Sequence, residues 1–157
     1  MNKALPPFQW TNFKLRYPHD VGAPGETPPL EWTPDLGRIF GGVNSRVNTG
    51  IVSETDTRAL LDTWDIWPAR GDCNDYAVTK RSELLRLGYP ASVLLLAEVH
   101  RSVDAAKVDH MVLFVRTRTG NIVLDNLTPA LLSEGTMPYT IIRVQSKTDP
   151  DVWESPT

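Results

Sequence analysis

The chain has a single cysteine, no long apolar run and no excess of basic charge, and each absence excludes a class of protein. With one cysteine among 157 residues, no disulfide can form within the chain. No stretch approaches the roughly 20 consecutive apolar residues of a membrane-spanning helix. The net charge is −3 and the basic residues are scattered, so the sequence offers no field for holding nucleic acid. We therefore expect a protein without a membrane span and without a nucleic-acid partner.

The start of the sequence also lacks the apolar core of a signal peptide. Together with the absence of a disulfide, this indicates a cytoplasmic protein as the sequence is written. A periplasmic location is expected instead if the sequence is a mature or trimmed form. No motif indicates an oligomeric state.

Length and composition indicate one compact domain, because 157 residues that are 41% hydrophobic can bury a sizeable core. Residues 1–34 are rich in proline and show no sustained periodicity, which predicts an irregular arm. The arm carries aromatic residues, which disordered segments usually lack. We therefore expect it to pack on a single core domain formed by residues 35–157.

Apolar spacing predicts helices in the first half of the core domain and strands in the second half. The helices are expected over 35–47, 57–64 and 72–87. The strands are expected over 92–99, 110–116, 121–125 and 139–144. The polar stretch 100–109 is expected to be a connecting loop. Helices followed by an antiparallel sheet predict the α+β class, with the helices packed on the sheet.

Cys73 follows Gly71-Asp72, a turn that opens directly into the clearest predicted helix. A helix N-terminus carries about half a positive charge, so a thiol placed there ionises more easily, and the thiolate is the reactive form. A lone cysteine is also commonly a small buried hydrophobic residue. The other polar residues that could act with Cys73 decide between a nucleophile and a packing residue.

The candidate partners are His110, which begins one predicted strand, and Asp125, which ends the next. The two strands flank a short turn and form a hairpin, so their outer ends lie together. The carboxylate is then placed to hold one imidazole nitrogen and leave the other facing a thiol. We predict Cys73 as nucleophile, His110 as base and Asp125 as orienting acid. Asp109 is disfavoured as the acid, because neighbouring residues of a strand point to opposite faces.

Acyl transfer also needs a donor for the oxyanion. The backbone N–H of Cys73 is one candidate, and the side chains of Asn44, Asn48 and Trp67 are others. The sequence does not choose among them. Asn126, next to the proposed acid, either supports the triad or serves the turn.

Asp72 and Asp75 flank the cysteine and have two interpretations. As the N-cap and a first-turn acid they would stabilise the helix. As a pair of carboxylates they would contribute to a calcium site, although calcium takes six or more oxygen ligands and this pair supplies too few alone.

The motifs resemble those of the bacterial transglutaminase-like cysteine proteinases, including the LapG-like members. The residues that carry the resemblance are Val43-Asn44, Val47-Asn48, Gly71-Asp72-Cys73-Asn74-Asp75-Tyr76-Ala77, Lys80-Arg81, His110-Met111-Val112-Leu113, Leu124-Asp125-Asn126 and Arg143-Val144-Gln145-Ser146. The resemblance covers most of the chain and implies a papain-like or transglutaminase-like core. It also implies a Cys-His-Asp triad at the three residues chosen above.

By the same resemblance, calcium would bind at Asp72 and Asp75. Asn74 stands where LapG-like relatives carry a glutamate, and no other cofactor is implied. The function expected is that of a cysteine peptidase that cleaves a protein or peptide substrate through a thioester acyl-enzyme. Two alternatives stay open, namely transglutaminase-type acyl transfer to an amine and a catalytically idle protein-binding domain of the same fold.

Overall fold

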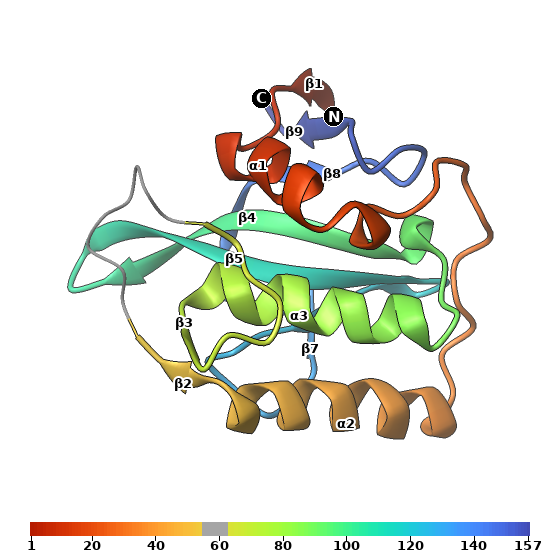
Figure 1. Ribbon diagram of the computed structural model, residues 1–157, viewed down its shortest axis with the longest axis horizontal. Helices are drawn as coiled ribbons and strands as arrows, with labels where there is room; N and C mark the ends of the chain where they lie inside the picture. The colour runs from red at the N-terminus through yellow and green to blue at the C-terminus, as the bar shows by residue number, and fades with distance from the viewer. Residues whose placement is uncertain (55–62) are drawn as a thin grey trace.

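The computed structural model describes residues 1–54 and 63–157, and in this part of the chain the architecture is α+β (Figure 1). The helices are α1 (Phe8–Arg16), α2 (Pro34–Gly50) and α3 (Cys73–Arg86), with 3-10 turns at Pro18–Asp20 and Ala91–Val93. The strands are β1 (Asn2–Ala4), β2 (Val52–Ser53), β3 (Arg70–Gly71), β4 (Leu94–Val103), β5 (Ala106–Thr117), β6 (Gly120–Leu124), β7 (Leu132–Ser133), β8 (Thr140–Gln145) and β9 (Trp153–Ser155). The prediction of helices packed on an antiparallel sheet is confirmed.

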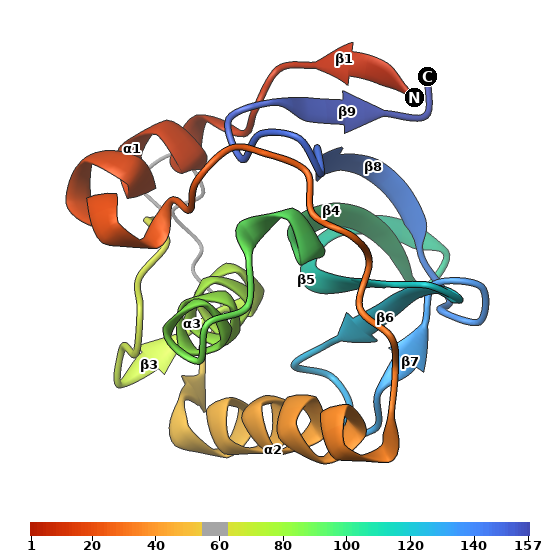
Figure 2. The same cartoon turned by 90° about the vertical axis from the view of Figure 1, so that its right-hand side faces the viewer.

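The main sheet has seven strands in the order β1-β9-β8-β4-β5-β6-β7, with antiparallel pairing throughout. β2 and β3 form a separate parallel pair. β4 lies in the middle of the main sheet, where its apolar run predicts it. Figure 2 shows α3 between the sheet and α2, while α1 lies on the side of β9. No helix within the described residues is long and apolar enough to cross a membrane.

The helices at α2 and α3 confirm the sequence prediction. Thr33 caps α2 by accepting a hydrogen bond from the backbone of Leu36, and Pro34 suits the first turn because its missing N–H needs no partner there. A helix was also expected over 57–64, of which residues 57–62 lie outside the described residues. Residues 63 and 64 are not helical.

The first 34 residues are more regular than the sequence suggests, and the expectation of an irregular arm was wrong. They contain β1 and α1, and β1 pairs with β9 at the edge of the main sheet. Trp10 and Phe13 of α1 are buried in the core beneath the helices. The prolines flank α1 instead of interrupting it, and the helix is too short for its periodicity to stand out.

The prediction of a loop over residues 100–109 was also wrong, because this stretch is the tip of a hairpin. β4 runs on to Val103 and β5 begins at Ala106, joined by Asp104 and Ala105 with positive φ angles of 50° and 65°. The tip projects beyond α2 and α3 in Figure 1. Residues 102–109 are exposed, so this part of the hairpin has no need of the apolar alternation by which strands are recognised.

The sheet separates two apolar clusters. Met111 and Leu113 of β5 join the first cluster, which also takes in side chains of all three helices. Val112 and Phe114 point the other way and join the second cluster, formed mainly by the sheet and the segment before β8. This alternation along β5 decides on which face each neighbouring polar residue lies.

Candidate active site

Cys73 is the first residue of α3, and it is half-buried against the first cluster. Asp72 is the N-cap and accepts a hydrogen bond from the backbone of Asn74 at 3.1 Å. Asp75 completes a capping box, because its Oδ2 accepts from the backbone of Asp72 at 3.0 Å. The thiol is thereby held at the positive end of the helix.

His110 and Asp125 are in contact, as the hairpin predicts. Nε2 of His110 donates to Oδ1 of Asp125 at 2.8 Å, and the two residues are 4% and 1% exposed. β6 ends at Leu124 opposite Leu113, so Asp125 lies just past the paired part of the hairpin. The hydrogen bond uses Nε2 of the imidazole, and Nδ1 is the nitrogen available for a second partner.

The approach to His110 follows from the strand register. His110 is paired with Val99 and shares its face of β5 with Val112, whereas Cys73 packs against the cluster on the opposite face. Because β6 has ended at Leu124, it does not cover the edge of β5 beside His110. That edge of β5 lies on the side where Asp125 leaves the sheet.

The carboxylate of Asp125 has donors at both oxygens. Oδ1 also accepts from the backbone of Leu127 at 3.0 Å, and Oδ2 accepts from the hydroxyl of Tyr139 at 2.5 Å. Burial by itself would raise the pKa of this carboxyl, but the hydrogen bonds from His110 and Tyr139 outweigh it and hold the pKa below its ordinary value. Asp125 is therefore an anion beside the imidazole at neutral pH.

Tyr139 is a site residue that the sequence did not reveal. Its ring also meets the imidazole of His110 edge to face, with centroids 5.3 Å apart and planes at 66°. The sequence marks Tyr139 only as the start of a predicted strand. No local pattern ties it to Asp125, which precedes it by 14 residues.

Lys80 of α3 is a second residue near Asp125 that the sequence did not assign to the site. It is 1% exposed, and its ammonium lies 5.9 Å from the ring centre of Tyr76. Burial lowers the pKa of Lys80 to about 7, with the charge of Asp125 acting in the opposite direction. Lys80 lies two turns along α3 from Cys73, so this buried amine faces the same side of the helix as the thiol.

The asparagine candidates for the oxyanion hole have partners in the folded chain. Nδ2 of Asn44 donates to the carbonyls of Thr128 and Pro129, and Nδ2 of Asn48 donates to those of Asp125 and Thr128. Both amides thus fasten the segment after Asp125 to α2. Their role as oxyanion donors stays a prediction.

The indole N–H of Trp67 also has a partner, because it donates to Glu83 at 2.9 Å, and its role as an oxyanion donor stays a prediction. The side-chain oxygen of Asn126 is buried without a hydrogen-bond partner in the described structure. It lines a cavity of about 230 Å³ beside the segment after Asp125. The role predicted for Asn126, turn or support, stays a prediction.

The carboxylates of Asp72 and Asp75 fasten the helix start, and calcium binding at this pair stays a prediction. Besides the capping box, Oδ1 of Asp75 accepts from the backbone of Asp65 at 2.7 Å. Burial raises the pKa of Asp75 to about 7, with the neighbouring acids adding to the rise. Among residues 1–54 and 63–157, no group of three or more His, Cys, Asp or Glu is placed to hold a metal. This pair falls short of the six oxygens that calcium takes.

The other candidates for the acid and the base lie away from the His110 and Asp125 pair, and Asp109 is not the acid that contacts His110, as expected. Asp109 Oδ1 lies 3.0 Å from Nδ1 of His100 on the projecting hairpin, away from Asp125. His19 belongs to the 3-10 turn after α1. Neither histidine shares the carboxylate that His110 holds.

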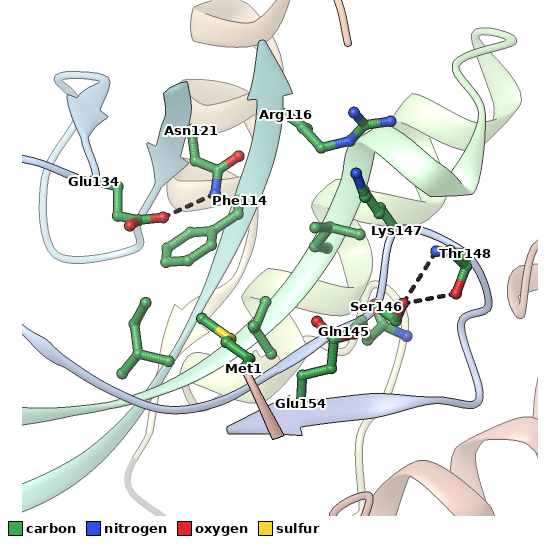
Figure 3. A pocket seen from close by; sticks show the side chains of 13 residues that line it. Met1, Phe114, Arg116, Asn121, Glu134, Gln145, Ser146, Lys147, Thr148 and Glu154 are labelled. Atoms are coloured by element: carbon green, nitrogen blue, oxygen red, sulfur yellow. Dashed lines mark hydrogen bonds between the residues drawn. The ribbon is translucent and has the colours of Figure 1, made fainter. Parts of the chain in front are cut away.

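A cavity of about 320 Å³ opens on the second cluster, and none of the three predicted catalytic residues lines it (Figure 3). Phe114 belongs to its apolar floor. Several of its polar residues bond to one another, since Asn121 donates to Glu134 at 2.8 Å and the hydroxyls of Ser146 and Thr148 lie 2.8 Å apart. The cavity is therefore distinct from the His110 and Asp125 pair.

Comparison with known proteins identifies the family and the fold of the chain. The family model described as bacterial transglutaminase-like cysteine proteinase, BTLCP, matches residues 1–156. Among solved structures, calcium-bound LapG of Legionella pneumophila is 23% identical with a TM-score of 0.63, over 81% of this chain and 72% of that one. EGTA-treated LapG of the same organism is 22% identical with a TM-score of 0.59, over 81% and 70%. No curated protein matches the chain. At these identities the solved structures establish a shared fold.

Proposed function

This chain belongs to the bacterial transglutaminase-like cysteine proteinases, and from that premise we propose that it hydrolyses a peptide bond with Cys73, His110 and Asp125. The observation that carries the proposal is the buried hydrogen bond from Nε2 of His110 to Asp125. It orients the ring so that Nδ1 is the nitrogen for the thiol, and Cys73 stands at a helix N-terminus that favours its thiolate. The substrate class is a protein or peptide.

The mechanism is acyl transfer in two stages. Nδ1 of His110 takes the proton of the thiol, and Sγ of Cys73 attacks the carbonyl carbon of the scissile amide. The imidazolium then gives its proton to the departing amine, which leaves a thioester. Water, deprotonated by His110, attacks the thioester and releases the acid and the thiol. Asp125 stabilises the imidazolium throughout.

The oxyanion donor of this proposal is the backbone N–H at the start of α3, because the side-chain candidates are engaged elsewhere. The chemistry needs no cofactor. A protein of the same fold is calcium-bound, and Asp72 and Asp75 alone supply too few oxygens for that ion, so no step is routed through it.

The first test is the rate of Cys73 alkylation by iodoacetamide from pH 4 to 9, in the wild type, in His110→Ala and in the matched control His100→Ala. We expect fast alkylation well below pH 8.5, lost in His110→Ala and kept in His100→Ala, because only His110 forms the ion pair with the thiol. A thiol that titrates near pH 8.5 in all three proteins would refute the triad.

Two further assays separate hydrolysis from its alternatives. A peptidase generates new chain termini, whereas a transglutaminase incorporates a primary amine into a glutamine-bearing protein. An idle binding domain would bind its partner equally well as the wild type and as Cys73→Ala, and would show no turnover in either form.

A further inference from the structure

Tyr139 contacts both members of the buried pair that the mechanism uses. Its hydroxyl donates to Oδ2 of Asp125 at 2.5 Å, and its ring packs edge to face on the imidazole of His110. Within the described residues, this is the only hydrogen bond to Oδ2, since His110 and Leu127 both donate to Oδ1. The side chain of Tyr139 thus contacts both Oδ2 of Asp125 and the imidazole ring of His110.

The position of Tyr139 is determined by the second apolar cluster. It immediately precedes β8, and it packs against the cluster with Ile141, its neighbour on the same face. Ile141 is paired with Val99, which is in turn paired with His110 across β4 and β5. The tyrosine is therefore part of the packed layer that carries the imidazole.

Tyr139 can act only as a donor to the acid. Burial raises the pKa of its phenol, and the hydrogen bond to Asp125 raises it further. The hydroxyl therefore keeps its proton over the pH range in which a protease works. Since an isolated carboxylate is costly to bury, a donor at Oδ2 favours the anion and directs Oδ1 to Nε2 of His110.

We propose that Tyr139 is the positioning residue of the active site, which keeps Asp125 ionised and holds the ring of His110 with Nδ1 toward the thiol. This inference rests on the proposed function for its consequence in catalysis. Its geometric content, a donor that sets the charge state of Asp125, can be tested without turnover.

The test compares Tyr139→Phe, which deletes the hydroxyl and keeps the ring, with the matched control Tyr17→Phe. Tyr17 also donates to an aspartate, Oδ1 of Asp65 at 3.2 Å. The pKa of Asp125 is measured by carbon-13 NMR of the carboxyl, assigned with Asp125→Asn. We expect a rise of about one to two pKa units in Tyr139→Phe, the size expected for a lost hydrogen bond to a charged group. No rise is expected in Tyr17→Phe.

The second readout is alkylation of Cys73. In Tyr139→Phe the acid limb of the pH profile should move upward with the pKa of Asp125, because protonation of the acid removes the partner of the imidazolium. A purely structural role would lower the melting temperature and leave the acid limb in place. An unchanged pKa of Asp125 in Tyr139→Phe would overturn the inference.

If Tyr139→Phe does not fold, the wild type itself supplies the test. A hydroxyl hydrogen-bonded to a carboxylate should give a downfield proton resonance that disappears in Asp125→Asn, and its absence from the wild type would count against the inference. The two proposals fail separately. A slow, ordinary thiol in the wild type refutes the triad, whereas the NMR measurements decide the role of Tyr139 in either case.

Discussion

Lys80 shows how far burial alters a single side chain in this protein. The residue is almost inaccessible to solvent, and burial lowers the pKa of its amine to about 7 from 10.5. The nearby charge of Asp125 offsets only part of that effect. A buried amine that is partly neutral at pH 7 makes the stability of the protein depend on pH.

The folded pKa of Lys80 lies below its unfolded value, so its contribution to stability is present above pH 10.5 and is lost as the pH falls toward 7. Between pH 7 and 10 the free energy of unfolding of the wild type should rise by up to about 1.4 kcal/mol per pH unit from this group. Lys80→Met should remove that rise, as measured by urea unfolding at pH 7, 8 and 9.

Lys147→Met is the matched control, because the side chain of Lys147 is 51% exposed and pairs with Glu26 at the surface. It should keep the pH dependence of the wild type. Parallel stability curves for the wild type and Lys80→Met would show that the buried amine stays charged in the folded protein.

At the scale of the element, α3 depends on its first turn. The same two acids that resemble metal ligands in the sequence satisfy backbone donors at the helix start, and they hold Cys73 between them. Capping and the catalysis proposed for Cys73 therefore depend on the same helix start, because the free N–H groups that need a cap also favour a thiolate.

Asp72→Ala should lower the free energy of unfolding by about 1 kcal/mol, in the range of measured N-cap losses. Asp72→Ser should recover most of it, since serine also caps a helix well. Chemical denaturation of the three proteins checks the order. Equal stability of Asp72→Ala and the wild type would mean that the cap is not needed for α3.

At the scale of the whole molecule, the two ends of the chain close the same core. β1 pairs with β9 (Figure 2). Trp10 packs on Trp153 with ring centres 6.2 Å apart. Both tryptophans are fully buried. The first 34 residues therefore contribute to the core of the domain instead of only lying over it.

Trp10→Ala should destabilise the protein by about 3–5 kcal/mol, because it leaves a large cavity where α1 meets the sheet. Phe8→Ala is the control on the same helix, since Phe8 is 78% exposed and should cost less than about 0.5 kcal/mol. Thermal and urea unfolding measure both. Similar losses in the two variants would contradict the core role of α1.

Local signals in the sequence account for much of the fold and for part of the site. Asp72 and Gly88 mark the ends of α3, and the alternation around the turn at 117–120 predicts the hairpin that joins His110 to Asp125. These features depend on neighbouring residues alone. Helix caps, periodicity and turns can therefore be predicted from neighbouring residues, without the rest of the chain.

Tertiary structure decided the remainder, because it depends on contacts between distant segments. Asn48 and Tyr139 approach Asp125 from 77 and 14 residues away, and their partners turn one into a fastening for the loop and the other into a donor to the acid. The sequence by itself determined the α+β class, the positions of α2 and α3 and the hairpin that brings His110 to Asp125, because these depend on neighbouring residues. Only the tertiary structure decided that α1 joins the core, which donors reach Asp125 and which pKa values shift, since burial and hydrogen-bond partners exist only in the folded chain.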